Sequence, residues 1–201
     1  MKWFARPASP GSKEPGSGRA LFVFWLALSG AAAGHPSGWV SREAWGSRPH
    51  PIDSSMRHRP LRVNLHHSGV VWKTGDDPLV KIVNLQRWGQ REKAWPDLPY
   101  HFLVAPDGRI FEGRELQFQP ESNTDYPLRG VINVQLWGDF QVQPLPLAQL
   151  RATVELLRWL REEHGLTELT THQQEAPGQT TCPGAEVQRL FDDGSWLRWR
   201  N

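Results

Sequence analysis

Side chains that commonly bind metal ions stand where predicted secondary structure ends. His66 and His67 close an alternating, strand-like stretch, and His172 follows a second candidate strand. Cys182, the one cysteine of the chain, is followed by proline and glycine, which indicates a loop. Two imidazoles and one thiolate make a ligand set suited to Zn²⁺ that leaves a fourth position for water, as catalytic zinc sites do.

Spacing alone leaves several interpretations of these residues open. A histidine at a strand end is more often simply a polar residue that meets solvent. The lone thiol of Cys182 is compatible with an inert buried residue, with a nucleophile served by a histidine base, or with a metal ligand. A disulfide scaffold within the chain is excluded, because there is only one cysteine.

The elements that must position these residues are visible in the periodicity of apolar side chains. An acidic N-cap and a proline at Asp77 and Pro78 mark the start of one helix, and Gly165 marks the end of another. We predict strands at 62–66, 101–105, 109–112, 131–137 and 168–171, and helices at 78–92, 147–164 and 185–191. Strands interleaved with helices predict an α/β fold in which helices layer a sheet.

Composition limits the class of protein. The chain has 201 residues, of which 38% are hydrophobic and 22% are charged, and this suits one soluble, compact domain with a short appendage. The formal net charge is +2 and the basic residues are scattered. Because no basic stripe could follow a phosphate backbone, we expect no nucleic-acid partner.

The N-terminal part has the composition of an export segment. A basic lead rich in proline, glycine and serine precedes the apolar run 20–34, which ends in small residues. The run is short for a membrane span of about 20 residues, and an uncleaved N-terminal anchor is the alternative. We therefore assign 1–37 to a signal peptide or anchor with a linker and 38–201 to the folded domain. The expected location is the periplasm or the extracellular space, with membrane contact only through such an anchor.

Four residue strings carry a family resemblance. They are WVSREAWGSRP at 39–49, HHS at 66–68, YHFLVAPDGRIFEGRE at 100–115 and THQQEAPGQTTCPG at 171–184. In this order they resemble the type 2 N-acetylmuramoyl-L-alanine amidases, a family that includes peptidoglycan recognition proteins and amidase-type phage lysozymes. The resemblance covers roughly residues 39–192. It implies a central mixed β-sheet flanked by α-helices, with zinc in a surface groove.

The resemblance also implies roles for individual residues. The first histidine of the HHS string, the histidine of the THQQ string and the cysteine before Pro-Gly are the zinc ligands, which gives His66, His172 and Cys182. The tyrosine beside the zinc falls on Tyr100, and Thr180 stands at a position that is lysine or threonine in family members. Both are expected to donate hydrogen bonds to the oxyanion of the reaction.

The neighbours of these residues are expected to differ in role. His67 should point to the opposite face of its strand, where it packs or forms hydrogen bonds. We expect His101 and Arg114 to serve the structure. Gln135 stands where some bacterial members carry a catalytic glutamate, so the sequence does not identify the general base.

The activity implied by the resemblance is zinc-dependent hydrolysis of the amide between N-acetylmuramic acid and L-alanine in bacterial peptidoglycan. The substrate would be peptidoglycan or a muropeptide. A non-catalytic module that binds peptidoglycan is the alternative from another class. Such binders typically lack the cysteine or the first histidine, and this chain retains all of its expected ligands, which favours the enzyme.

Overall fold

The computed structural model describes residues 34–196. Nearly all of the predicted export segment lies outside the described residues, so its assignment stays a prediction. Within the described part of the chain, no helix is both long and apolar enough to cross a membrane.

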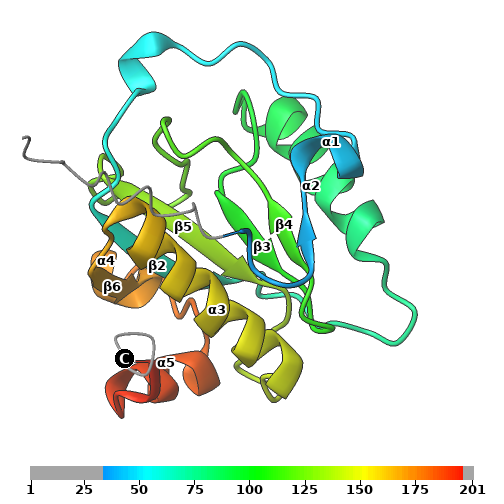
Figure 1. Ribbon diagram of the computed structural model, residues 1–201, viewed down its shortest axis with the longest axis vertical. Coiled ribbons are helices and arrows are strands. Elements are labelled where there is room, and N and C mark those ends of the chain that lie inside the picture. Colours follow the sequence, from blue (N-terminus) through cyan, green and yellow to red (C-terminus); the bar gives the residue numbers. More distant parts are fainter. Residues whose placement is uncertain (1–33, 197–201) are drawn as a thin grey trace, which may run out of the picture. The chain divides into compact units, whose positions relative to one another are not determined.

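A six-stranded mixed sheet forms the centre of the domain (Figure 1). In spatial order the strands are β1 (Trp39–Val40), β4 (Ile110–Glu112), β3 (Phe102–Val104), β5 (Val131–Leu136), β2 (Arg62–His67) and β6 (Glu168–Thr171). The last four of these run parallel to one another, whereas β4 is antiparallel to β3 and parallel to β1. The five predicted strands are confirmed to within two residues at each end, and only the short β1 was not predicted.

Three longer helices match the predicted ones. They are α2 (Pro78–Glu92), α3 (Leu147–His164) and α5 (Ala185–Asp192). The side chain of Asp77 accepts a hydrogen bond from the amide of Leu79 and caps α2, while Gly165 ends α3 with a φ of 67°. Three short elements had no periodicity to reveal them: α1 (Arg42–Trp45), the 3₁₀ helix at Ser54–Met56 and α4 (His172–Glu175).

Helices cover both faces of the sheet, so the mixed α/β fold expected from the sequence is confirmed (Figure 1). On one face, α3 and α5 pack on a buried apolar cluster that includes Val63, Leu65, Val134, Leu156 and Val187. The alternation of side chains along a strand is what sends every second residue to this face.

The opposite face is covered by α1 and α2 and is chemically mixed. Its apolar cluster includes Trp45 of α1, Ile82 of α2, and Leu103 and Phe111 of the sheet. Because their neighbours in β2 and β5 face α3, Asn64, His66, Asn133 and Gln135 project to this side, and all four are buried. This polar strip on the sheet is the floor on which the candidate site is built.

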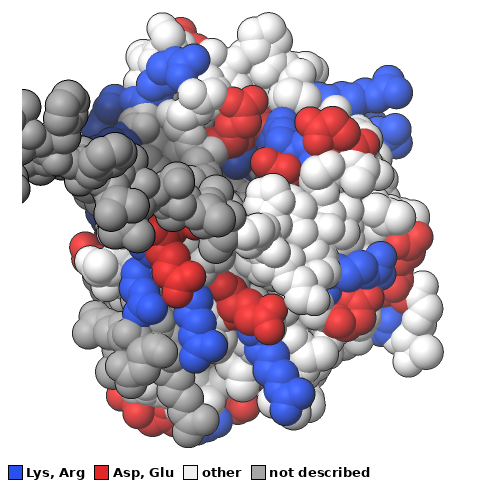
Figure 2. Space-filling view, in the orientation of Figure 1, with Lys and Arg blue, Asp and Glu red and all other residues white. Residues whose placement is uncertain are grey.

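Charged side chains of both signs lie on the face of the molecule that Figure 2 draws, where Lys and Arg are interspersed with Asp and Glu around an uncharged central area. Within residues 34–196, ion pairs include Arg109 with Asp107 at 2.8 Å and Arg62 with Glu175 at 2.8 Å.

Candidate metal centre

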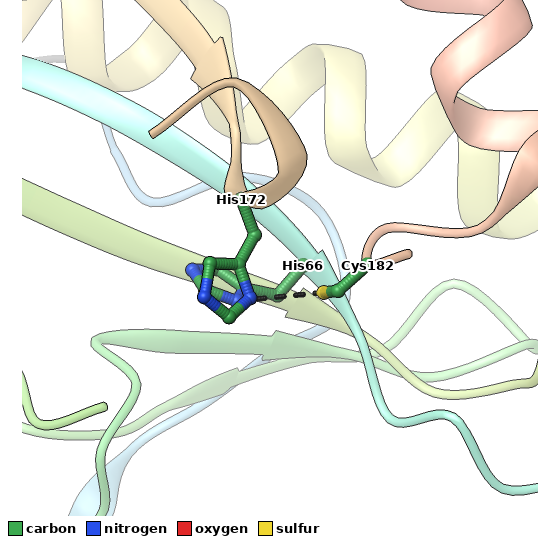
Figure 3. Close-up of side chains that lie close together, drawn as sticks. All are labelled: His66, His172 and Cys182. Carbon is green, nitrogen blue, oxygen red and sulfur yellow. Dashed lines mark hydrogen bonds between the residues drawn. The ribbon is translucent and has the colours of Figure 1, made fainter. Parts of the chain in front are cut away.

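The expected ligand residues converge from three separate elements (Figure 3). His66 is the penultimate residue of β2, His172 is the first residue of α4, and Cys182 lies in the loop before α5. One ligand atom from each residue lies within 4.8 Å of the others. Cys182 Sγ is 3.6 Å from His66 Nδ1, and the two imidazole centroids are 4.4 Å apart.

Local backbone structure explains how each side chain reaches this point. In β2 the alternation of side chains aims His66 away from α3. In α4 a capping box at Thr171, with reciprocal hydrogen bonds to Gln174, begins the helix at His172. Around Cys182 the amide of this residue donates to Thr180 Oγ1 at 3.0 Å, and the amide of His67 donates to Cys182 Sγ at 3.3 Å.

Burial controls the protonation of all three groups. The side chains are nearly inaccessible, at 3% exposed for His66 and 9% each for His172 and Cys182. Burial, and secondarily the nearby His172, lowers the pKa of His66 well below its usual value, and burial lowers the pKa of His172 to about 4. Both imidazoles are therefore neutral at pH 7. Burial raises the pKa of the Cys182 thiol to about 12, so a thiolate here needs a neighbouring cation.

The arrangement fits a zinc ion. His172 Nδ1 is buried and has no hydrogen-bond partner within residues 34–196. A buried nitrogen without a partner is costly unless something else, such as a metal, uses its lone pair. Zinc bonds of about 2.0–2.3 Å place ligand atoms roughly 3.3–3.8 Å apart, and the 3.6 Å between Cys182 Sγ and His66 Nδ1 lies in this range. The donor set of neutral imidazoles and a thiol also matches the preference of zinc.

A small pocket of about 100 Å³ opens onto the two histidines. Its wall is formed by α2, by the segment before β3 and by the loop before β5. The lining residues are His66, Leu85, Trp88, Trp95, Pro99, Tyr100, Glu121, Ser122, Asn123 and His172. The pocket is mostly apolar and aromatic with a few convergent polar groups, a combination typical of binding sites.

The two expected hydrogen-bond donors are placed differently. Tyr100 lines the pocket, with its ring edge-on to His66 at a centroid distance of 5.3 Å. Burial raises the pKa of Tyr100, so it remains a neutral phenol that can donate a hydrogen bond. Thr180 is not part of the pocket wall, and its hydroxyl instead accepts the amide of Cys182. Its expected role therefore stays a prediction.

The neighbouring residues expected to be structural do form structural contacts. The amide of Phe140 donates to Nδ1 of His67 at 3.2 Å, on the α3 side of β2. Nε2 of His101 donates to the Phe118 carbonyl at 2.9 Å, and its Nδ1 accepts the amide of Asn133 at 3.0 Å. Arg114 is 1% exposed and donates to backbone carbonyls, including that of Leu98.

Sequence reasoning missed several residues of the pocket and its border. Trp88 of α2 and Glu121 line it, and Thr124 Oγ1 lies 2.5 Å from His172 Nε2. Glu121 and Thr124 lie outside the four strings that carry the resemblance, so no motif predicted a role for them. Burial raises the pKa of Glu121, which is also 3.5 Å from Arg114.

Comparison with known proteins identifies the family. The profile of N-acetylmuramoyl-L-alanine amidases matches residues 56–185. The chain belongs to this family. The match includes every one of the converging ligand residues, and it confirms the resemblance found in the sequence.

Relatives within the family carry two kinds of names. Peptidoglycan recognition protein 1 of Bos indicus is 30% identical over 183 residues, which are 87% of this chain and 93% of that protein. An N-acetylmuramoyl-L-alanine amidase of Sus scrofa is 29% identical over 169 residues, covering 80% of this chain and 27% of that protein. A crystal structure of the recognition proteins PGRP-LCa and PGRP-LCx with bound tracheal cytotoxin is 25% identical, with a TM-score of 0.67, and covers 77% of this chain and 94% of that chain.

Proposed function

We propose that this protein is a zinc-dependent amidase that hydrolyses the bond between N-acetylmuramic acid and L-alanine in peptidoglycan. The observation that carries the proposal is the convergence of His66, His172 and Cys182 beside a pocket, with ligand atoms within 4.8 Å of one another. A set of three protein ligands, which leaves one position for water, is typical of catalytic zinc.

Bound zinc would supply the Lewis acid that activates water and polarises the scissile carbonyl. The residues of the chain hold and orient the reactants. Tyr100 presents a neutral O–H group in the same pocket, where it can donate to the oxyanion that forms during amide hydrolysis, a contribution of about 3 kcal/mol. The hydroxyl hydrogen of Thr180 is not used in the bond with Cys182 and is the second donor of the proposal.

The choice of bond and substrate rests on the family. Zinc-activated water can attack any well-placed carbonyl, so the metal ligands alone do not select the muramoyl amide. Relatives named as amidase and as peptidoglycan recognition proteins support a peptidoglycan or muropeptide substrate for this chain, as does the relative that holds tracheal cytotoxin. Trp88 and Trp95 in the pocket wall offer apolar surface for such a ligand.

Digestion of purified peptidoglycan, followed by mass spectrometry, tests the proposal. We expect intact stem peptides with a free L-alanine amino terminus and uncut glycan strands, together with about one zinc per chain by metal analysis. A chelator should abolish release, because the ligand residues alone generate no nucleophile. Cys182→Ser should lose most of the activity, because a neutral hydroxyl replaces a thiolate ligand poorly.

Gln135→Ala tests the position at which some bacterial members carry a catalytic glutamate, and it should retain substantial activity if that position no longer supplies the base. New reducing sugar ends, or cleavage within the stem peptide, would overturn the assignment. Binding of peptidoglycan without any release would instead identify a recognition module. Activity that persists in metal-free protein but is lost in Cys182→Ser would identify a cysteine nucleophile.

A further inference from the structure

A hydroxyl group from a distant segment contacts one of the candidate ligands. Thr124 Oγ1 lies 2.5 Å from His172 Nε2, although the two residues are 48 positions apart in the chain. Thr124 is in the loop before β5, and His172 begins α4. The hydroxyl contacts Nε2 of the imidazole. The other ring nitrogen, Nδ1, has no hydrogen-bond partner in the described part of the chain.

The direction of this hydrogen bond decides which nitrogen can bind a metal. A neutral imidazole carries a single hydrogen. If Nε2 carries it and donates to Thr124, Nδ1 has an available lone pair. If Thr124 donates instead, the hydrogen is on Nδ1, where it would be a buried donor with no acceptor among residues 34–196 and would block the lone pair from a metal.

Ser122 offers the acceptor that the first direction needs. Its Oγ is 3.0 Å from Thr124 Oγ1 and accepts the amide of Thr124 at 3.1 Å. The Thr124 hydroxyl can therefore accept from His172 and pass its own hydrogen to Ser122. In this arrangement Thr124 Oγ1 accepts the Nε2 hydrogen of His172, and Ser122 Oγ accepts the hydroxyl hydrogen of Thr124.

The two residues that follow Thr124 hold this segment in place. Asp125 N donates to Gln179 Oε1 at 2.9 Å, and Gln179 Nε2 donates to the Asp125 carbonyl at 3.1 Å. Next to it, Tyr126 is 7% exposed and its ring lies 5.3 Å from that of His172. These contacts keep the Thr124 hydroxyl in place without a ligand, as preorganised sites require.

We propose that Thr124 is a positioning residue for zinc: it accepts a hydrogen bond from His172 Nε2 and thereby fixes the tautomer that presents Nδ1 to the metal. The part of this proposal that concerns zinc rests on the proposed function, whereas the part that concerns the tautomer of His172 is independent of it. Partners of this kind orient metal-binding histidines in many proteins, and their loss typically weakens metal binding by about 10–100-fold.

The first test measures the tautomer in zinc-free protein. Long-range ¹H–¹⁵N spectra of ¹⁵N-histidine-labelled protein, with His172→Gln to assign the signals, should show hydrogen on Nε2 of His172. Thr124→Val, which keeps the shape but removes the hydroxyl, should shift His172 toward a mixture of tautomers, and Thr124→Ser should restore the pattern of the parent chain. Hydrogen on Nδ1 of the parent protein would overturn the proposal.

The second test measures the zinc dissociation constant by competition with a chromophoric chelator. Thr124→Val should raise it about 10–100-fold, and Thr124→Ser should bring it back to near the parent value. Circular dichroism establishes that each variant is folded. Equal zinc affinity of the valine variant and the parent would overturn the positioning role. If the parent protein binds no zinc, the proposed function fails, while the tautomer measurement still decides whether Thr124 accepts or donates.

Discussion

His66 and His67 are adjacent in sequence but face opposite sides of β2. His66 lies with His172 and Cys182 on the α2 side, and Nδ1 of His67 instead accepts the amide of Phe140. This separation follows from the two-residue repeat of a β-strand. A single position therefore decides whether the imidazole is a candidate ligand or a structural group.

We predict that substitutions at these two positions have different effects. His66→Ala should reduce bound zinc from about one per chain to a small fraction, because one of three ligands is lost. His67→Ala should keep most of the zinc and lower the free energy of unfolding by about 1 kcal/mol, because a buried hydrogen bond is lost. Metal analysis and urea unfolding measure both effects, and a reversed zinc result would show that the assignment on β2 is shifted by one residue.

At the level of elements, the position of His172 depends on how α4 begins. Thr171 is completely buried, and its Oγ1 accepts the amide of Gln174 while donating to Gln188 Oε1 of α5 at 2.8 Å. One side chain thus caps a four-residue helix and ties it to the next helix. Such a short helix has little stability of its own, since helix formation is cooperative and needs more turns.

We predict that Thr171→Val destabilises the fold and weakens zinc binding together. The variant has nearly the same shape but cannot cap α4 or bond to Gln188, so the free energy of unfolding should fall by about 1–2 kcal/mol. Thr167→Val, at an exposed position in the same region, is the matched control and should change little. Unaltered stability and zinc affinity of Thr171→Val would contradict the importance of this cap.

For the whole molecule, a buried histidine links stability to pH. His101 is completely buried between two hydrogen bonds, in which Nε2 donates and Nδ1 accepts. Burial lowers the pKa of His101 to about 3, against about 6.5 in an unfolded chain. Below about pH 6.5, His101 is therefore protonated in the unfolded chain but stays neutral in the folded protein. The free energy of unfolding decreases as the pH falls.

We predict a decline in the free energy of unfolding of up to about 1.4 kcal/mol per pH unit from this residue between about pH 6 and pH 3, with none above pH 7. His101→Gln should be less stable at pH 7 but should lose correspondingly less stability on acidification. His50→Gln, at an exposed site, should keep the slope of the parent protein. Urea unfolding at several pH values gives the slopes, and an equal slope for His101→Gln would show that other groups cause the acid sensitivity.

Much of the fold and the candidate ligand set could be predicted from short-range features of the sequence. Apolar periodicity located α2, α3, α5 and five of the six strands, because burial of one face imposes a repeat on consecutive residues. The short β1, α1 and α4 were missed, because none of them shows an apolar repeat in the sequence. His66, His172 and Cys182 were predicted as ligands because their strings resemble those of the family, and the structure brings the three residues together.

Only the tertiary structure could decide which residues meet. Parallel pairing of β2 with both β5 and β6 brings His66 beside Gln135 and near the end of the strand that leads into His172. Loops next to this sheet decide three further placements. Thr124 contacts His172, Glu121 lines the pocket, and Thr180 lies outside the pocket wall. A sequence determines side-chain chemistry and local periodicity, which are short-range properties. The juxtaposition of distant segments is set by strand order, register and packing of the whole domain, and so the surroundings of the ligands became visible only in three dimensions.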